Sequence, residues 1–393
     1  MPRVVFTSNL RRHIDCPEAS LEAETVREAL EAVFAENPAL RSYIVDDQMR
    51  LRTHMVLRDP RDGYRYLALD HGHFGTKLHR SSGDGTTWEE IAVPVFPEFT
   101  DEDRQQQADS GEWGAKRDFS TLHEIWELTP GGADQPGVLW AGSIPGGLFR
   151  SSDRGTTWEL NQSLWNRDDR WQWFGGGKNH PGIHAIRVHP SNSQAITVGI
   201  SIGGVWLTED GGETWSARGD GMRADYVPPE AAKKNNAQDV HMLAQCPADP
   251  ATMWVQHHNG IFHTTNGGDT GEELDHVQPS GFGFAVVAHP HDSQTAWFVP
   301  GVKDECRVPV DGKMVVTRTR DGGKTFESLT GGLPQEHCYD IVFRHGLDVD
   351  ATGDRLVMGS STGSLWVSED GGDSWECVST HLPQIYYARF VSG

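Results

Sequence analysis

The stretch Ser151-Ser152-Asp153-Arg154-Gly155-Thr156-Thr157-Trp158 decides the fold, because related stretches recur five more times along the chain. The other copies begin at Ser81, Thr208, Thr264, Thr319 and Ser368. Subtracting consecutive first residues gives spacings of 70, 57, 56, 55 and 49 residues. Repetition at such a period is typical of an architecture assembled from similar structural units.

The shared pattern is Ser/Thr-x-Asp-x-Gly-x-Thr-Trp, which predicts a turn locked by side chains. The first copy departs from it with Gly83 at the Asp position, the fourth with Asn266 at the Asp position and Gly271 at the Trp position, and the fifth with Phe326 in place of Trp. The Asp and Ser/Thr oxygens can accept hydrogen bonds from nearby backbone N–H groups. The Gly can adopt a backbone conformation that strains other residues. The aspartates expected to have this structural role are Asp153, Asp210, Asp321 and Asp370. Strand-like residues flank each copy, so each copy is predicted to be the turn of a β-hairpin.

The pattern resembles the Asp box, or bacterial neuraminidase repeat, of sialidase-like β-propellers, and Ser151 to Trp158 matches it in full. The resemblance implies that the boxes lie on the outer turns of propeller blades. Each repeat also contains a strand-like segment, expected to be the inner strand of a blade. These segments are His54–Pro60, Glu124–Pro130, His184–Pro190, His241–Pro247, Phe284–Pro290 and Asp340–Gly346.

Together with a second strand and the box hairpin, each repeat has four predicted strands, which is blade organisation. We therefore expect a mainly β protein, a β-propeller with six Asp-box blades. The segment 385–391 leaves the number of blades open, since it could be a seventh inner strand with no blade behind it. The acidic, Gln-rich segment 96–119 is expected to be a surface loop.

The first 52 residues differ from the rest and predict a separate segment. Val4-Val5-Phe6 is strand-like, and Thr25 with Glu28 forms a capping box that predicts a helix start. The order of elements resembles the front of a β-grasp, ubiquitin-like fold, as in small sulfur-carrier proteins of molybdopterin and thiamine synthesis. The C-terminal Gly-Gly through which those carriers act is absent. We expect a partial β-grasp segment at 1–52, able to dock a protein partner, and an Asp-box propeller at 53–393.

Composition excludes several classes of partner. The formal net charge of −22 over 393 residues argues against nucleic acid and anionic membrane surfaces, which require clustered Lys and Arg. No apolar run approaches membrane-spanning length. The five scattered cysteines contain no CxxC pair, so neither a disulfide framework nor a zinc site is indicated. Because the N-terminus also lacks a signal sequence, a cytoplasmic protein without a cofactor is expected.

In a propeller, the segments that enter the inner strands share one face with the turns between second and third strands, and ligands usually bind there. A glycosidase needs one protonated and one ionised carboxyl group, and Glu124 and Asp340 begin two inner strands. They are the predicted catalytic pair. The predicted ligand-binding residues are His71, His73, Trp173, Lys178, His180, His184, His241, His257 and His258. The adjacent histidines could ligate a divalent metal, but spacing fixes no acidic third ligand, so no metal site is predicted.

Three functions remain open. In the first, a sialidase-like propeller binds a small polar or carbohydrate ligand at the channel mouth and acts as an exo-sialidase-like glycoside hydrolase. In the second, the chain is a non-catalytic scaffold or assembly protein that uses the propeller and the N-terminal segment for protein contacts. A third reading links the carrier-like segment to sulfur or cofactor metabolism.

Overall fold

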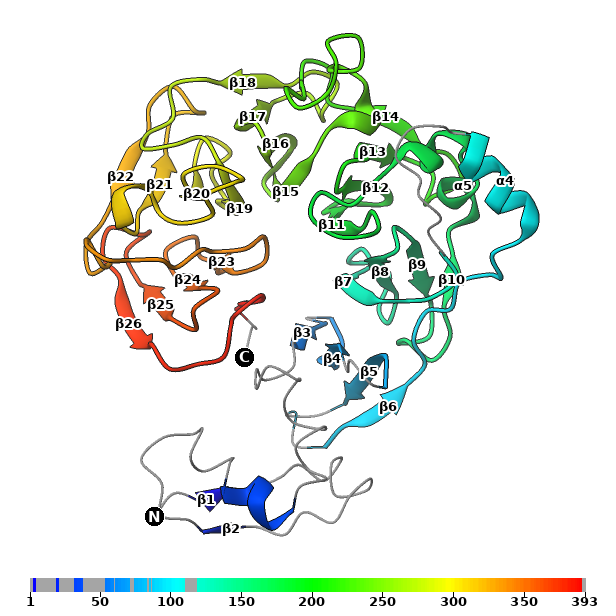
Figure 1. The fold of residues 1–393 in the computed structure, drawn as a ribbon, viewed down its shortest axis with the longest axis horizontal. Helices are drawn as coiled ribbons and strands as arrows, with labels where there is room; N and C mark the ends of the chain where they lie inside the picture. Colours follow the sequence, from blue (N-terminus) through cyan, green and yellow to red (C-terminus); the bar gives the residue numbers. More distant parts are fainter. Residues whose placement is uncertain are drawn as a thin grey trace.

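Six four-stranded antiparallel sheets are arranged as blades around a common centre in the computed structural model (Figure 1). The structure describes residues 3–4, 19–20, 32–37, 54–59, 61–70, 74–82, 85, 87–109 and 119–390. Every blade consists of four strands that are consecutive in the chain, and the first strand of each blade faces the centre. The fold is therefore mainly β, a six-bladed β-propeller, which confirms the propeller part of the predicted fold class and decides the number of blades.

The first three blades comprise the following strands: β3 (His54–Arg58), β4 (Arg65–Asp70), β5 (Thr76–Ser81) and β6 (Glu89–Ile91); β7 (Glu124–Pro130), β8 (Leu139–Ile144), β9 (Leu148–Ser151) and β10 (Glu159–Leu160); β11 (Ile183–His189), β12 (Asn192–Ile200), β13 (Gly204–Thr208) and β14 (Ser216–Arg218).

The last three blades comprise these strands: β15 (Val240–Cys246), β16 (Asp249–His257), β17 (Ile261–Thr264) and β18 (Glu272–Leu274); β19 (Gly283–Ala288), β20 (Ala296–Pro300), β21 (Val316–Thr319) and β22 (Glu327–Leu329); β23 (Leu347–Val349), β24 (Leu356–Gly359), β25 (Leu365–Ser368) and β26 (Glu376–Ser379). The helices of the propeller are short: α4 (Asp101–Asp109), α5 (Gln162–Trp165) and the 3-10 turns η2 (Asp168–Gln172), η3 (Asn235–Ala237) and η4 (Val310–Gly312).

The core lies between neighbouring blades. One cluster joins side chains of blades three, four and five, among them Val205, Trp254 and Phe298. Each buried tryptophan removes a large apolar area from water, so the faces of adjacent sheets are held together mainly by such side chains. Because each inner strand is packed against a neighbouring blade on both faces, both of its faces carry apolar side chains.

The repeated box forms the locked turn that its sequence predicts. Ser151 Oγ accepts from Gly155 N at 2.8 Å, and Asp153 Oδ1 accepts from Thr157 N at 2.9 Å. The copies that begin at Thr208, Thr264, Thr319 and Ser368 repeat both hydrogen bonds. Part of the first copy lies outside the described residues. These turns connect the third and fourth strands, at the outside of the blades.

Two predicted segments differ from the structure. The inner strand expected at 340–346 is wrong, because β23 begins at Leu347. Before it, Gly346 N donates to Phe343 O at 2.7 Å, and this tight turn replaces an extended chain. The segment 96–119 contains helix α4, and its Phe96 and Phe119 are buried, so it is not simply a surface loop.

The C-terminal segment 385–390 closes the ring between blade six and the first two blades. Ala388 N donates to His345 O at 2.8 Å, and Tyr387 forms a single parallel bridge with His345. The Tyr387 ring also packs against the core cluster that contains Leu57 and Leu128, from blades one and two. The segment forms no strand, so it is not a seventh inner strand.

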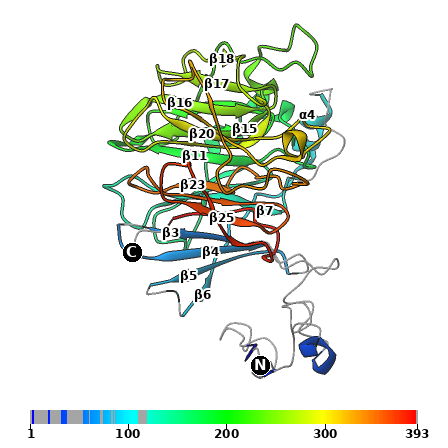
Figure 2. The same ribbon diagram turned by 90° about the vertical axis from the view of Figure 1, so that its left-hand side faces the viewer.

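Little of the N-terminal segment is described. Strand β1 (Arg3–Val4) pairs antiparallel with β2 (Ala19–Ser20), and residues 32–36 are helical with Val33 and Phe34 buried. The β1–β2 pair lies outside the ring of blades in both views (Figure 1, Figure 2). The predicted β-grasp fold of 1–52 lies mostly outside the described residues. Within the described part of the chain, no helix is both long and apolar enough to cross a bilayer.

Candidate functional site

A cavity of about 510 Å³ lies in the channel where the inner strands finish. It is lined by the second halves of the inner strands and by the turns that follow them. Its volume is in the range usual for small-molecule sites. The ionisable residues in its lining are Arg61, Glu127, Arg187, His189, His345, Asp348 and Arg389. The prediction from sequence had placed the ligand at the other end of the channel, where the inner strands begin.

Glu127 is the centre of a buried ion network at this cavity. The fourth residue of β7, it is 1% exposed, and its Oε2 lies 2.8 Å from His345 Nε2. Its Oε1 lies 3.6 Å from Arg187 Nη1 and 3.5 Å from Arg389 Nη2. Burial acts to raise the pKa of Glu127, but His345 and the two arginines outweigh burial and lower the pKa to about 2. Glu127 is therefore ionised at neutral pH.

Asp348 has the opposite shift in the same cavity. It lies on β23, is partly buried, and its Oδ2 accepts from Phe390 N at 2.8 Å. Burial raises the pKa of Asp348 above its ordinary value, although Arg389 acts to lower it. One cavity thus contains a carboxylate that is held ionised and a carboxyl group that retains its proton more readily. A pair of carboxyl groups with pKa values driven apart is the arrangement from which acid and base roles arise.

The predicted catalytic pair lies elsewhere, and its two members have separate partners. Glu124 Oε2 pairs with Lys178 Nζ at 3.0 Å. Asp340 accepts hydrogen bonds from Ser360 Oγ at 2.6 Å, from Cys338 Sγ and from Thr362 Oγ1. Burial acts to raise the pKa of Asp340, yet these hydrogen bonds lower it below its ordinary value. Asp340 is thus held ionised, the opposite of what a general acid requires.

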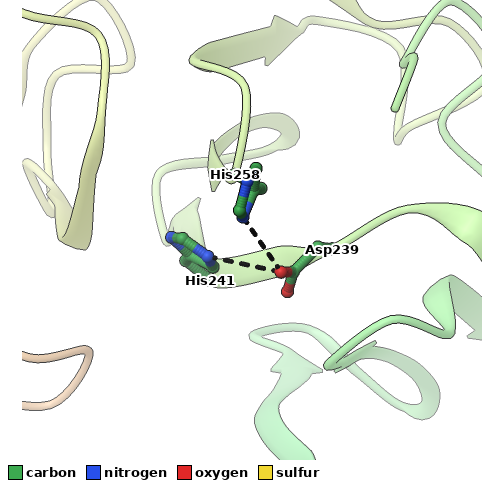
Figure 3. A group of neighbouring side chains, drawn as sticks. All are labelled: Asp239, His241 and His258. Atoms are coloured by element: carbon green, nitrogen blue, oxygen red, sulfur yellow. Dashed lines mark ion pairs between the residues drawn. The ribbon is translucent and has the colours of Figure 1, made fainter. Parts of the chain in front are cut away.

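At the channel mouth, defined by the residues at the starts of the inner strands, two predicted histidines meet an aspartate (Figure 3). Asp239 Oδ2 lies 3.5 Å from His241 Nε2 and 3.3 Å from His258 Nδ1. Asp239 immediately precedes β15 and His258 immediately follows β16, which pairs with β15. The backbone hydrogen bond from His258 N to Asp239 O, 3.0 Å long, fixes the two residues opposite each other.

A glycine-rich loop covers this mouth. A Cβ at Gly176 would lie 2.8 Å from Asp239 Oδ2, so the loop can approach the carboxylate only because residue 176 has no side chain. Two residues further on, Lys178 pairs with Glu124 at the start of β7. Arg344 of blade six stacks over the Trp126 ring, with 4.9 Å from Cζ to the ring centroid. Side chains of several blades therefore converge at this end of the channel.

Four predicted ligand-binding residues are buried: His241 at the channel mouth, and Trp173, His184 and His257. Trp173 is 1% exposed and packs against Trp206 in the core, while His184 and His257 have no exposed surface. Burial lowers the pKa of His184 well below its ordinary value and that of His257 to about 3, so both are neutral at pH 7. His180 is partly buried, and its ring contacts Phe119. His71 and His73 lie outside the described residues.

Sequence reasoning missed Glu127, Asp348 and Asp239. Glu127 carried a usable signal, because a charged residue between Trp126 and Leu128 in a strand buried on both faces requires partners. Asp239 also carried a sequence signal. It stands two residues before His241, and positions two apart in a strand share a face. For Asp348, the shifted position of β23 hid its place in the inner strand.

Part of the chain is similar in sequence to curated xyloglucanases. No protein-family model matches the chain. The oligoxyloglucan-reducing end-specific xyloglucanase of Emericella nidulans is 25% identical over 252 residues, which are 61% of this chain and 25% of that protein. The chain spans about a quarter of the length of the curated xyloglucanases that it matches. The similarity is therefore to one part of a larger enzyme.

Solved structures share the fold. The family 74 glycoside hydrolase xyloglucanase from Xanthomonas campestris superimposes with a TM-score of 0.56 and 16% identity, over 86% of this chain and 48% of that one. The protein YCF48 bound to D1 peptide gives a TM-score of 0.50 and 14% identity, over 86% and 88% of the two chains. The sialidase-specific part of the prediction gains no support from these proteins.

Proposed function

We propose that the chain is a carbohydrate-active propeller that binds a glycan in the channel cavity and hydrolyses a glycosidic bond there. The observation that carries the proposal is the pair of carboxyl groups in one cavity, Glu127 with a lowered pKa and Asp348 with a raised pKa. Glycosidases use one carboxyl group as acid and an ionised one as base or nucleophile. The similarity to xyloglucanases supports this class of reaction.

In this scheme, Asp348 donates its proton to the glycosidic oxygen as the bond to the leaving sugar breaks. Glu127, ionised, stabilises the positive charge that develops on the sugar ring. Water then attacks the charged ring carbon and gives its proton to the Asp348 carboxylate, which restores the acid. His345, Arg187 and Arg389 hold Glu127 ionised and orient it. Glu127 is thus in the ionised form at neutral pH, and burial favours the protonated form of Asp348.

The test measures turnover of chromogenic glycosides and of xyloglucan oligosaccharides by the full-length protein. Asp348→Asn should lower the turnover number by a factor of about 10² to 10⁴, the usual contribution of a general acid. Glu124→Gln and Asp340→Asn, carboxylates at the other end of the channel, serve as matched controls and should leave turnover within about twofold. Turnover that depends on Glu124 or Asp340 and not on Asp348 would reject the proposed pair.

One observation favours a second function, that of a scaffold. YCF48 bound to D1 peptide matches over 88% of its own length, whereas the xyloglucanase matches over 48%. A propeller of this size can therefore serve as a peptide-binding protein. Absence of turnover, together with absence of glycan binding by calorimetry, would favour this function.

A further inference from the structure

The cluster at the channel mouth has a different chemistry from the cavity and lies at the other end of the inner strands. Asp239, His241 and His258 each offer one ligand atom, and these three atoms lie within 4.8 Å of one another. Figure 3 shows both imidazole rings directed at the carboxylate. Asp239 is 3% exposed and His241 is 1% exposed, so the two residues cannot be explained as solvated surface groups.

The ring of His241 lies between two oxygen atoms. Its Nδ1 lies 2.6 Å from the backbone oxygen of Gly283. Because a carbonyl oxygen only accepts, Nδ1 donates its hydrogen to Gly283, and Nε2 is the ring atom directed at Asp239. Nε2 lies 3.5 Å from Asp239 Oδ2, a separation that two ligand atoms of one metal ion can have. A histidine that ligates a metal typically donates its other N–H to a backbone carbonyl in this way.

The distances within the cluster fit a shared metal ion better than direct hydrogen bonds. Charge-assisted N–H···O bonds are about 2.7–2.9 Å long, whereas Asp239 Oδ2 lies 3.5 Å from His241 Nε2 and 3.3 Å from His258 Nδ1. Zinc–ligand distances of about 2.0–2.2 Å at a tetrahedral centre separate the ligand atoms by about 3.3–3.6 Å. Both measured separations fall in that interval.

Three further features bear on metal binding: the second oxygen of Asp239, access from solvent, and the nearby positive charges. Asp239 Oδ1 is buried and has no hydrogen-bond partner among the described residues. The His258 side chain is 24% exposed, so an ion can reach the cluster from solvent. Arg344 and Arg307 both stack on Phe284, whose ring stacks on His241. Their positive charge lowers the affinity of the cluster for a cation.

We propose that Asp239, His241 and His258 form a binding site for one divalent transition-metal ion at the channel mouth. Two imidazole nitrogens and one carboxylate oxygen are donors suited to Zn²⁺, Co²⁺ or Fe²⁺. Three protein ligands leave a fourth position open for water or for a hydroxyl group of a ligand. The site does not depend on the proposed hydrolysis, since Glu127 and Asp348 belong to the cavity at the other end.

Calorimetric titration of the metal-stripped full-length protein with Zn²⁺ tests the proposal, and Co²⁺ absorption spectroscopy reports the ligands. We expect one ion per chain, a tetrahedral Co²⁺ spectrum, and affinity at least 10-fold lower in His258→Gln and Asp239→Asn. The control is His276→Gln, because His276 Nδ1 lies 3.3 Å from Asp275 Oδ1, the same spacing at an exposed site. This variant should bind as the wild type does.

Absence of stoichiometric binding by the wild type would overturn the proposal, as would equal binding by His258→Gln or equal loss in His276→Gln. Asp239 is buried, so Asp239→Asn could lose its fold, and circular dichroism identifies that case. His258→Gln and the wild-type Co²⁺ spectrum then decide the outcome. Hydrolysis assays play no part in this test, so failure of the metal site and failure of the proposed function are distinguishable.

Discussion

His345 Nε2 lies 2.8 Å from Glu127 Oε2 and 2.8 Å from the backbone oxygen of His184. Both neighbours are acceptors, so Nε2 carries a hydrogen and the ring binds blade six to blades two and three. The C-terminal segment joins the same network through Arg389. Closure of the propeller and the electrostatics of the cavity therefore depend on one set of side chains.

Glu127→Gln should destabilise the protein at pH 7 by about 3–5 kcal/mol, the usual result of removing one partner of a buried ion pair. The variant leaves Arg187 and Arg389 without their carboxylate. Urea denaturation measures the change. Exposed Lys77 and Glu90 form a matched pair on blade one, and Glu90→Gln should change stability by less than about 1 kcal/mol. Equal effects of the two substitutions would contradict a central role of Glu127.

The lowered pKa of Glu127 predicts a loss of stability in acid. Its contribution is complete above the unfolded-state pKa, near 4.5, and disappears as the pH falls towards the folded-state pKa of about 2. Denaturation curves at pH 7, 4.5 and 3 should therefore show a steeper loss below pH 4.5 for the wild type than for Glu127→Gln. Parallel pH profiles of the two proteins would contradict the assignment.

His257 predicts a second acid-dependent loss at higher pH. Burial lowers its folded-state pKa to about 3, below the unfolded value near 6.5. The unfolded chain therefore binds the proton first, and stability present above pH 6.5 declines as the pH falls. His257→Gln should reduce this slope between pH 6.5 and 5. The exposed His381 provides the control, because His381→Gln should leave the slope unchanged.

The locked turns predict unequal costs for two threonines of one box. Thr319 has no exposed surface, and its Oγ1 accepts from Gly323 N at 2.9 Å. Thr319→Val keeps the shape but leaves this N–H unpaired, which should cost about 1–3 kcal/mol. Thr325 is exposed, and Thr325→Val should cost less. Thermal denaturation of both variants gives the comparison, and a larger loss for Thr325→Val would be inconsistent with the role of Thr319.

The sequence allowed the architecture to be predicted far better than the site. The box is local, so Ser151, Asp153 and Gly155 specify their own turn. The repeat period predicts six blades, but only the structure shows that 385–390 is not the start of a seventh. The strand 124–130 was predicted with its observed bounds because it occupies the inner-strand position of its repeat. The cavity depends on long-range contacts, such as Glu127 with His345, that no local pattern encodes. The side-chain direction of Trp173 likewise depends on which surface its loop packs against.

The most direct test of the central claim is the initial rate of glycoside hydrolysis by the wild type and Asp348→Asn at pH 7, with Asp340→Asn measured alongside. The proposed pair predicts that the wild type turns over at least one glycan, that Asp348→Asn loses activity by about 10² or more, and that Asp340→Asn retains it. Full activity in Asp348→Asn, or its loss in Asp340→Asn alone, would contradict a catalytic cavity at Glu127 and Asp348.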